Sequence, residues 1–197
     1  MHRMAALLLA EHAPRDGRVL VVGAGGGMEL KAFALAYPEW RLVGVDPSAE
    51  MLSLALVTLG SLASQVELHH GFVNTAPQGP FDAASCLLTL HFTPPDERLR
   101  TLREIHRRLK PRAALAVMHL SCGQEGAERT LWLARYAAFA IASGVAPEQA
   151  RAGAASIHEK LPILAPEQDE ALIREAGFAD VKIFYAGLAF RGWVASA

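Results

Sequence analysis

Glycines and a carboxylate follow two apolar runs near the start of the chain. Residues 19–22 are Val-Leu-Val-Val and lead into Gly-Ala-Gly-Gly-Gly at 23–27, while Val43-Gly44-Val45 lead into Asp46. Glycines let a backbone turn tightly and approach a ligand where any Cβ would collide. A carboxylate at the mouth of the next strand can accept hydrogen bonds from both hydroxyls of a ribose. The two segments together predict a nucleoside-binding crevice.

The spacing of the glycines limits the class of ligand that the turn can bind. Gly23, Gly25 and Gly27 alternate with other residues, and Met28 follows them. A dinucleotide-binding turn would place its third small residue at position 28, where the next helix packs beside a pyrophosphate. The spacing therefore favours a smaller nucleoside, although these residues alone leave open a nicotinamide site or a purely structural turn.

Histidines near the ends of apolar runs are candidates for proton transfer. His91 and His119 stand where strands are expected to end, and histidine can accept a proton near neutral pH. The more frequent role of such a histidine is to satisfy a buried backbone group. His69 and His70 are adjacent on an expected strand and face opposite sides, which argues against a shared metal ion. We expect no metal site.

Apolar strand-like runs alternate with helical segments along the chain, which predicts a doubly wound, mostly parallel, seven-stranded sheet with helices on both faces. Between the last two runs there is almost no linker, and a parallel crossover needs a dozen or more residues. The last strand should therefore be antiparallel. The expected strands are about 18–23, 41–46, 65–70, 81–88, 113–120, 180–187 and 189–196, and the expected helices are about 28–37, 48–60, 95–110, 125–143, 147–159 and 167–176.

Length and composition limit the class of protein. With 197 residues, 52% of them hydrophobic, the chain can bury the core of one domain over residues 1–197. The formal net charge of −1 gives no overall positive field, so nucleic acid is not an expected partner. Neither Cys86 nor Cys122 has metal-ligand spacing, which predicts small core residues in a reducing cytoplasm.

The apolar stretch at residues 4–10 is short for a membrane span and is interrupted by Glu11 and His12. It runs directly into the first strand. We therefore expect a helix packed on the sheet and a soluble, cytoplasmic protein with no membrane partner.

The helix after the fourth strand has a clear expected start. Thr93 can act as its cap, Pro94 suits the first helical position, and Asp96 favours the helix N-terminus. Its cations lie opposite an apolar stripe and predict a solvated face rather than a polyanion site. These cations are Arg100, Arg103, Arg107, Arg108 and Lys110.

Five segments in order resemble the motifs of class I S-adenosylmethionine-dependent methyltransferases. The glycine turn and Asp46 are similar to the family's first two motifs, and the stretch Gly79 to Leu88 resembles its fourth-strand motif. Arg108-Leu109-Lys110-Pro111 and Glu175-Ala176-Gly177-Phe178 resemble the segments before its fifth and sixth strands. The resemblance covers about residues 17–121 and 166–196.

The resemblance implies S-adenosyl-L-methionine as cofactor and a set of contacts to it. The glycine turn would approach the methionine portion and ribose, Asp46 would hold the ribose hydroxyls, and the segments after it would surround the adenine. The implied cofactor-binding residues are Gly23, Ala24, Gly25, Gly27, Asp46, Pro47, Met51, Phe72, Leu87 and Leu88. No catalytic residue is assigned, because methyl transfer mainly needs positioning and exclusion of water.

Three positions depart from the resembled family. Val21 stands where many members carry an acidic residue, an expected anchor for the methionyl amine or for the local hydrogen-bond network. Phe72 stands where a polar side chain usually reads the adenine amine, and Arg112 stands where a glycine usually follows the Lys-Pro pair.

Three functions remain open from the sequence. The first is methyl transfer to a small-molecule acceptor. The second is a synthase or tRNA-modification enzyme using a carboxylated donor, because residues 90–98 and 190–195 resemble carboxy-S-adenosylmethionine synthases, with Arg191 as a candidate cation. The third is an inactive nucleoside-binding module.

Residues 122–165 form the one insertion large enough to cover the crevice. We expect this insertion to be a helical lid. Its apolar positions pack as a core or face an acceptor. They are Trp132, Leu133, Tyr136, Phe139 and Ala140. The segment before the first strand is brief for the resembled family. A truncated chain, a late start, or cover supplied by a second copy in a homodimer would each account for this.

Overall fold

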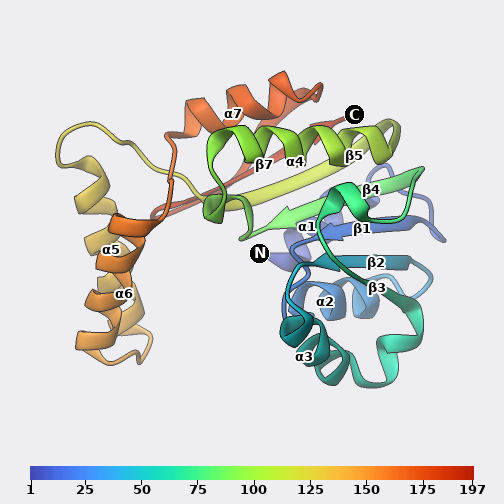
Figure 1. Ribbon diagram of the computed structural model, residues 1–197, viewed down its shortest axis with the longest axis horizontal. Coiled ribbons are helices and arrows are strands. Elements are labelled where there is room, and N and C mark those ends of the chain that lie inside the picture. The colour runs from blue at the N-terminus through green and yellow to red at the C-terminus, as the bar shows by residue number, and fades with distance from the viewer.

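The computed structural model describes residues 1–197 and contains a seven-stranded sheet in the order β3-β2-β1-β4-β5-β7-β6 (Figure 1). Apolar runs with buried side chains on both faces form the central strands, as parallel sheets require. The strands are β1 (Arg18–Val22), β2 (Arg41–Asp46), β3 (Val66–His70), β4 (Phe81–Leu87), β5 (Leu109–Leu120), β6 (Ala179–Gly187) and β7 (Phe190–Ser196).

Seven α-helices accompany the sheet: α1 (His2–Ala10), α2 (Met28–Ala36), α3 (Ala49–Leu59), α4 (Pro95–Arg108), α5 (Glu128–Ala142), α6 (Pro147–Lys160) and α7 (Pro166–Glu175). One sheet face packs against α4 and α7, where Leu102 and Ile173 join a core with Leu20 of β1. The other face packs against α1, α2 and α3, where Leu9 and Phe33 belong to a second core. Figure 1 shows the two helical layers on opposite sides of the sheet.

The direction of each strand confirms the expected fold. The pairs β1–β2, β1–β4, β2–β3 and β4–β5 are parallel, whereas β7 runs antiparallel to both β5 and β6. Only Leu188 and Ala189 separate β6 from β7, so these strands form a hairpin. Each expected strand and helix is present, although β5 begins at Leu109 rather than at residue 113.

Helices α5 and α6 form a hairpin that stands apart from the sheet, at the left of Figure 1. They pack on each other through Leu133, Ala137 and Ala154, and this small core continues to Leu120 at the end of β5. The hairpin occupies most of residues 122–165. No helix in the molecule is long and apolar enough to span a membrane.

The start of α4 differs from the expectation by one residue. Pro94 is the N-cap and Pro95 is the first helical residue, because the Pro94 carbonyl accepts the hydrogen bond from the Arg98 backbone N–H at 2.8 Å. The Thr93 hydroxyl does not cap the helix and instead donates to the Leu90 carbonyl at 2.9 Å.

The expectation that all cations of α4 are solvated was wrong for Arg108. Its side chain is buried, donates to the Asn74 carbonyl at 3.0 Å and pairs with Glu104. A buried guanidinium has to be paired and hydrogen-bonded. Glu104 lies one helical turn away, whereas Asn74 belongs to a segment 34 residues away. Arg100, Arg103 and Arg107 remain exposed.

Arg112 occupies a backbone conformation that suits glycine. Its φ is +67°, in the left-handed region, at the position where the resembled family carries a glycine. The Arg112 N–H donates to the Ala197 carbonyl at 2.6 Å, which ties this strained residue to the end of the chain.

Candidate cofactor site

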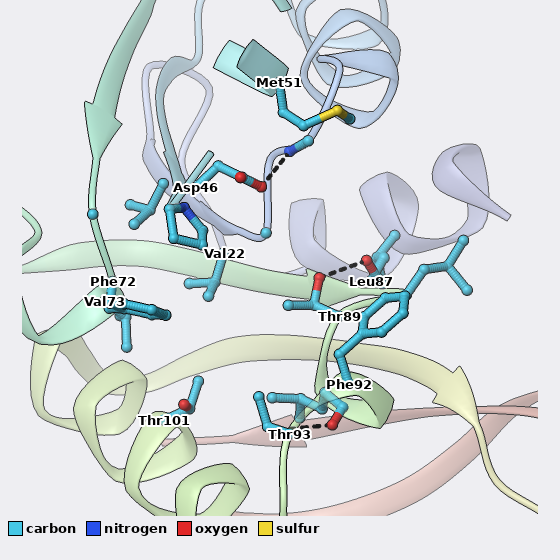
Figure 2. A pocket seen from close by; sticks show the side chains of 17 residues that line it. Val22, Asp46, Met51, Phe72, Val73, Leu87, Thr89, Phe92, Thr93 and Thr101 are labelled. Atoms are coloured by element: carbon cyan, nitrogen blue, oxygen red, sulfur yellow. Dashed lines mark hydrogen bonds between the residues drawn. The ribbon is translucent and has the colours of Figure 1, made fainter. Parts of the chain in front are cut away.

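A cavity of about 530 Å³ opens at the carboxyl ends of β1, β2 and β4. The strand order changes direction between β1 and β4, and such switch points are where open α/β sheets bind ligands. Its volume lies in the usual range for small-molecule sites. The lining residues are Val22, Gly23, Gly25, Val45, Asp46, Pro47, Met51, Gly71, Phe72, Val73, Leu87, Leu88, Thr89, Leu90, Phe92, Thr93 and Thr101 (Figure 2).

Asp46, at the end of β2, is hydrogen-bonded to the glycine turn at residues 23–27. Its Oδ2 accepts a hydrogen bond from the Gly25 backbone N–H at 2.8 Å, and its Oδ1 accepts one from the Ser48 N–H at 2.9 Å. A carboxylate has about four lone-pair sites, so each oxygen can still accept a hydroxyl. Asp46 is also the only ionisable side chain among the lining residues.

The start of α3 forms one wall of the pocket. Ser48 is the N-cap, and its hydroxyl accepts a hydrogen bond from the Met51 N–H at 3.1 Å. This cap fixes the first turn, so that the thioether of Met51 lies beside Gly25. Figure 2 shows Met51 and Asp46 on the same side of the cavity.

The glycine turn is shaped by close approaches of backbone. Gly23 has φ +75°, and a Cβ there would lie 1.9 Å from the Thr89 hydroxyl oxygen. Gly25 has φ +50°, and a Cβ there would meet only Met51 Cε at 3.6 Å and the Gly23 carbonyl oxygen at 3.9 Å. The lack of a side chain at Gly23 thus lets Thr89, which follows β4, approach the turn. At Gly25 it leaves open space toward the cavity.

Two of the ten residues expected to bind the cofactor do not line the pocket. Ala24 is buried against Gly44 of β2. Gly27 has φ +81° and lets α2 approach α3, because a Cβ at Gly27 would lie 2.9 Å from Ala55 Cα. The structure therefore gives these residues packing roles. The other eight surround one cavity.

The chain after β3 supplies an aromatic edge. Phe72 is 68% exposed and lines the pocket, and the preceding Gly71 N–H donates to the Asp46 carbonyl at 3.0 Å. His69 and His70 make separate contacts, with the Thr75 hydroxyl and the Pro47 carbonyl, both at 3.0 Å. No group of metal-ligating residues forms anywhere in the molecule.

Sequence reasoning missed the wall opposite Asp46. Thr93 precedes α4 and Thr101 lies on it, and Figure 2 shows both across the cavity from Asp46. No motif marks either threonine. Val22 and Val45 could have been found, because each is near the carboxyl end of a strand whose neighbours were already assigned to the site.

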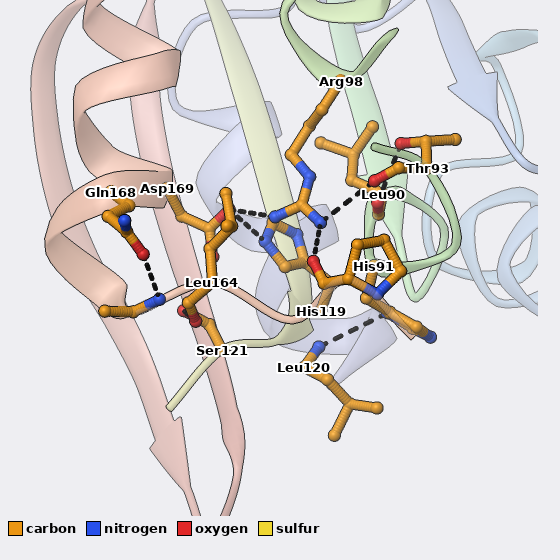
Figure 3. Close-up of polar contacts among 12 residues, drawn as sticks. Leu90, His91, Thr93, Arg98, His119, Leu120, Ser121, Leu164, Gln168 and Asp169 are labelled. Carbon is orange, nitrogen blue, oxygen red and sulfur yellow. Dashed lines mark hydrogen bonds and ion pairs between the residues drawn. The ribbon is translucent and has the colours of Figure 1, made fainter. Parts of the chain in front are cut away.

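Neither candidate histidine faces the cavity. His91 is buried, its Nδ1 accepts a 3.4 Å hydrogen bond from the Leu120 N–H, and burial lowers its pKa to about 3. His119 is buried with its Nε2 3.1 Å from Asp169 Oδ1. Both lie in a buried polar cluster with Arg98 and Asp169 (Figure 3), so the structural interpretation of these histidines is the better one.

Arg98 is the centre of that polar cluster, and sequence reasoning did not identify it. Its guanidinium pairs with Asp169 and donates to the Pro162 carbonyl at 3.0 Å and to the Thr93 carbonyl at 3.3 Å (Figure 3). Burial opposes ionisation of Asp169, yet its pKa lies below the usual value because His119 and Arg98 stabilise the carboxylate. Arg98 thus connects the pocket wall to the chain that returns from α6.

The helical insertion does not line the pocket. None of residues 122–165 contributes to the cavity, and Arg191 donates to the Leu188 and Phe190 carbonyls at 2.8 Å instead of facing it. Trp132 packs 4.6 Å from the Arg135 guanidinium, and Tyr136 contacts Phe190. Phe139 is 62% exposed.

Residues 19–112 match a family model described as a methyltransferase domain. This segment includes the glycine turn, Asp46 and the strands around the pocket. The matched segment is just under half of the chain, and together with the sheet order it supports a class I S-adenosylmethionine-dependent methyltransferase family for this protein. The methyl donor of that family is S-adenosylmethionine.

Individual relatives are distant. The chain is 23% identical over 155 residues to the carboxy-S-adenosyl-L-methionine synthase of Wolinella succinogenes, covering 79% of this chain and 65% of that protein. It is 24% identical over 199 residues to the synthase of the same name from Chromohalobacter salexigens, covering 98% and 73%.

The solved structures support the fold. An O-methyltransferase family protein from Burkholderia thailandensis superposes with a TM-score of 0.73 at 16% identity, covering 100% of this chain and 55% of that chain. The chain therefore spans little more than half the length of this structure, and a likeness at this identity shows the fold alone.

The residues present fit S-adenosylmethionine. The Asp46 carboxylate retains acceptor capacity for ribose hydroxyls, and Gly25 leaves space that a Cβ would fill. Apolar side chains of Met51, Phe72 and Leu87 offer flat or polarizable surface to a purine.

Proposed function

We propose that this protein binds S-adenosylmethionine in the cavity between β1, β2 and β4 and transfers its methyl group to a small-molecule acceptor. The observation that carries the proposal is the hydrogen bond between Gly25 and Asp46, which brings a side-chain-free turn and a carboxylate to one end of the sheet. The family assignment supports S-adenosylmethionine as the donor. The site supports only the class of the acceptor, a small molecule.

The proposed roles of the residues follow from their contacts. Asp46 accepts the ribose hydroxyls while Gly25 and Ser48 hold its carboxylate in place. Met51 and Phe72 flank the adenine, and Leu87 and Leu88 form the floor. The bound donor supplies an electrophilic methyl group on a sulfonium, and the protein's task is to orient it and exclude water.

The wall opposite Asp46 is proposed to receive the acceptor. Leu90 and Phe92 make it apolar, and the hydroxyls of Thr93 and Thr101 add neutral polar groups. A small, partly apolar acceptor suits this surface. The α5–α6 hairpin is proposed to act as a lid that would have to move toward the cavity, because in this structure none of its residues lines the cavity.

The second candidate is a carboxylated donor, which the names of the two curated relatives favour. A carboxylate on the donor's methyl position would call for a cation nearby. No Arg or Lys lines the pocket, and Arg191 is engaged with two backbone carbonyls. Methyl transfer is therefore the better supported proposal.

Calorimetry with S-adenosylmethionine, S-adenosylhomocysteine and NADH tests the proposal. We expect both adenosyl compounds to bind and NADH not to bind, and we expect the mass of any ligand that co-purifies to match one of the adenosyl compounds. Binding of NADH alone would overturn the proposal. Binding of the adenosyl compounds without turnover of any acceptor in a broad panel would favour the inactive module.

A further inference from the structure

Glu29 is a buried acid that the proposed roles leave unexplained. It lies in the first turn of α2, directly after the glycine turn, and is 5% exposed. Its Oε1 is buried and has no hydrogen-bond partner. A buried carboxyl group without partners is costly, so a function for it is to be expected.

Glu29 faces β4. Ser85 of β4 lies close enough to lower the pKa of Glu29, although the two groups do not meet in hydrogen-bond geometry. Ser85 pairs with Val21 of β1, and Val21 belongs to the core on the α2 side of the sheet. The Glu29 carboxyl therefore lies on the same face and level as the side chain of Val21, where the resembled family carries its acid.

The strand that lies beside this carboxyl group continues into the pocket floor. Leu87 lies two residues beyond Ser85 on the same face of β4 and lines the cavity. Two residues of a strand span about 7 Å. Within a protein, a full charge acts over such a distance more strongly than it would in water.

The lining of the pocket lacks a free countercharge for an ammonium group. Asp46 is its only ionisable side chain, and the proposed function assigns the remaining acceptor sites of Asp46 to the ribose hydroxyls. The amino-acid end of S-adenosylmethionine carries an ammonium group, which needs a negative partner when it leaves water.

We propose that Glu29 is the countercharge for the ammonium group of the donor's amino-acid end and replaces, from α2, the acid that Val21 lacks on β1. This inference rests on the proposed function, because it assigns a residue to the same donor site. Glu29 acts from beneath the floor as a positioning residue and does not touch the transferred methyl group.

Two ligands separate this role from a structural one. S-adenosylhomocysteine has the amino-acid end, whereas 5′-methylthioadenosine has the same nucleoside and thioether without it. We expect Glu29→Gln to weaken binding of S-adenosylhomocysteine about tenfold or more, which is 1.4 kcal/mol, and to leave binding of 5′-methylthioadenosine unchanged. Glu148→Gln, at an exposed glutamate in the first turn of α6, should change neither affinity.

The outcomes distinguish the inference from the proposed function. Equal loss of both ligands in Glu29→Gln, or unchanged binding of both, overturns the role of Glu29 while leaving the donor site in place. Failure of the wild-type protein to bind either ligand overturns the proposed function and this inference with it. Retained binding of 5′-methylthioadenosine also shows that the variant is folded.

A measurement on the wild-type protein alone provides a second test. Burial raises the pKa of Glu29 to about 8, so an approaching ammonium group should displace its proton near neutral pH. The neighbouring Cys86 stays a thiol there, because burial and the charge of Glu29 raise its pKa. S-adenosylhomocysteine should therefore release protons on binding in calorimetry with two buffers, and 5′-methylthioadenosine should not. Equal proton release by both ligands contradicts the inference.

Discussion

The Gly25 backbone N–H and the Asp46 carboxylate are joined by a hydrogen bond of 2.8 Å. Gly25 follows β1 and Asp46 ends β2, so the contact closes the loop ends of two adjacent parallel strands. It gives the carboxylate a fixed direction before any ligand arrives. Such preorganisation reduces the entropy that binding has to overcome.

Gly25→Ala should remove donor binding without unfolding the protein. Gly126 is a matched control, because its φ of +51° equals that of Gly25 within a degree and a Cβ there would meet nothing within 4 Å. Each substitution should lower the free energy of unfolding by about 1 kcal/mol or more, since alanine is strained at positive φ. In titrations with S-adenosylhomocysteine, only Gly25→Ala should weaken binding, and similar affinities for the two variants would refute this view of the turn.

Arg98→Met should be strongly destabilising. Arg98 and Asp169 are an ion pair with both side chains 1% exposed, and removing one partner leaves a buried charge, at a cost of about 3–5 kcal/mol. Adding Asp169→Leu should restore part of this loss. Urea denaturation measures the free energies of unfolding. Arg100→Met breaks an exposed pair with Asp96 and should cost about 1 kcal/mol or less, and an equal cost for both single variants would contradict the account.

His91 should make the protein less stable in acid. Burial, together with the charges of His119 and Arg98, lowers its pKa from 6.5 to about 3. Between these values the unfolded chain binds a proton that the folded chain refuses, so the free energy of unfolding decreases as the pH falls from 6.5 toward 3. Asp169, whose pKa is lowered, adds to the acid loss at the lower end.

The contribution of His91 is isolated by comparing variants. His91→Gln should lose less stability than the wild-type protein when thermal unfolding is followed from neutral pH to about pH 4. His12→Gln replaces an exposed histidine and should retain the wild-type slope. If the wild-type and His91→Gln proteins show the same slope, His91 is not buried as a neutral group.

Glu29 should have the opposite effect on stability at higher pH. Its pKa is raised from 4.5 to about 8, chiefly by burial, so in this interval the unfolded chain has lost a proton that the folded chain keeps. The free energy of unfolding therefore falls as the pH rises from 4.5 to about 8. In thermal unfolding, Glu29→Gln should become more stable relative to the wild-type protein as the pH rises over this range. A stability difference between the two proteins that does not change with pH would argue against a buried, protonated Glu29.

The order of elements was predictable from the sequence because apolar runs and helical periodicity alternate with short connections. The hairpin of β6 and β7 followed from the lack of linker, and the meeting of Gly25 with Asp46 followed from their places at the ends of neighbouring strands. Both predictions depend on short-range pattern and on the geometry of parallel sheets.

The remaining features depend on contacts that pattern does not encode. Arg108 resembles its exposed neighbours in sequence, and its burial depends on the carbonyl of Asn74 far along the chain. Within the Pro94-Pro95 pair, the first helical residue of α4 is Pro95 rather than the expected Pro94. Thr93 lines the pocket from just before α4 and Thr101 lines it from within α4, and no local motif marks either position.

The role of Asp46 in holding the ribose is measured by the affinity of Asp46→Asn for S-adenosylhomocysteine. Asparagine keeps the shape of the side chain but replaces one acceptor oxygen with an amide donor, which opposes the backbone N–H of Gly25 or of Ser48 and leaves fewer acceptor sites for the ribose hydroxyls. The account predicts at least about a tenfold loss of affinity in calorimetry, with a folded protein by circular dichroism. Affinity equal to that of the wild-type protein would contradict it.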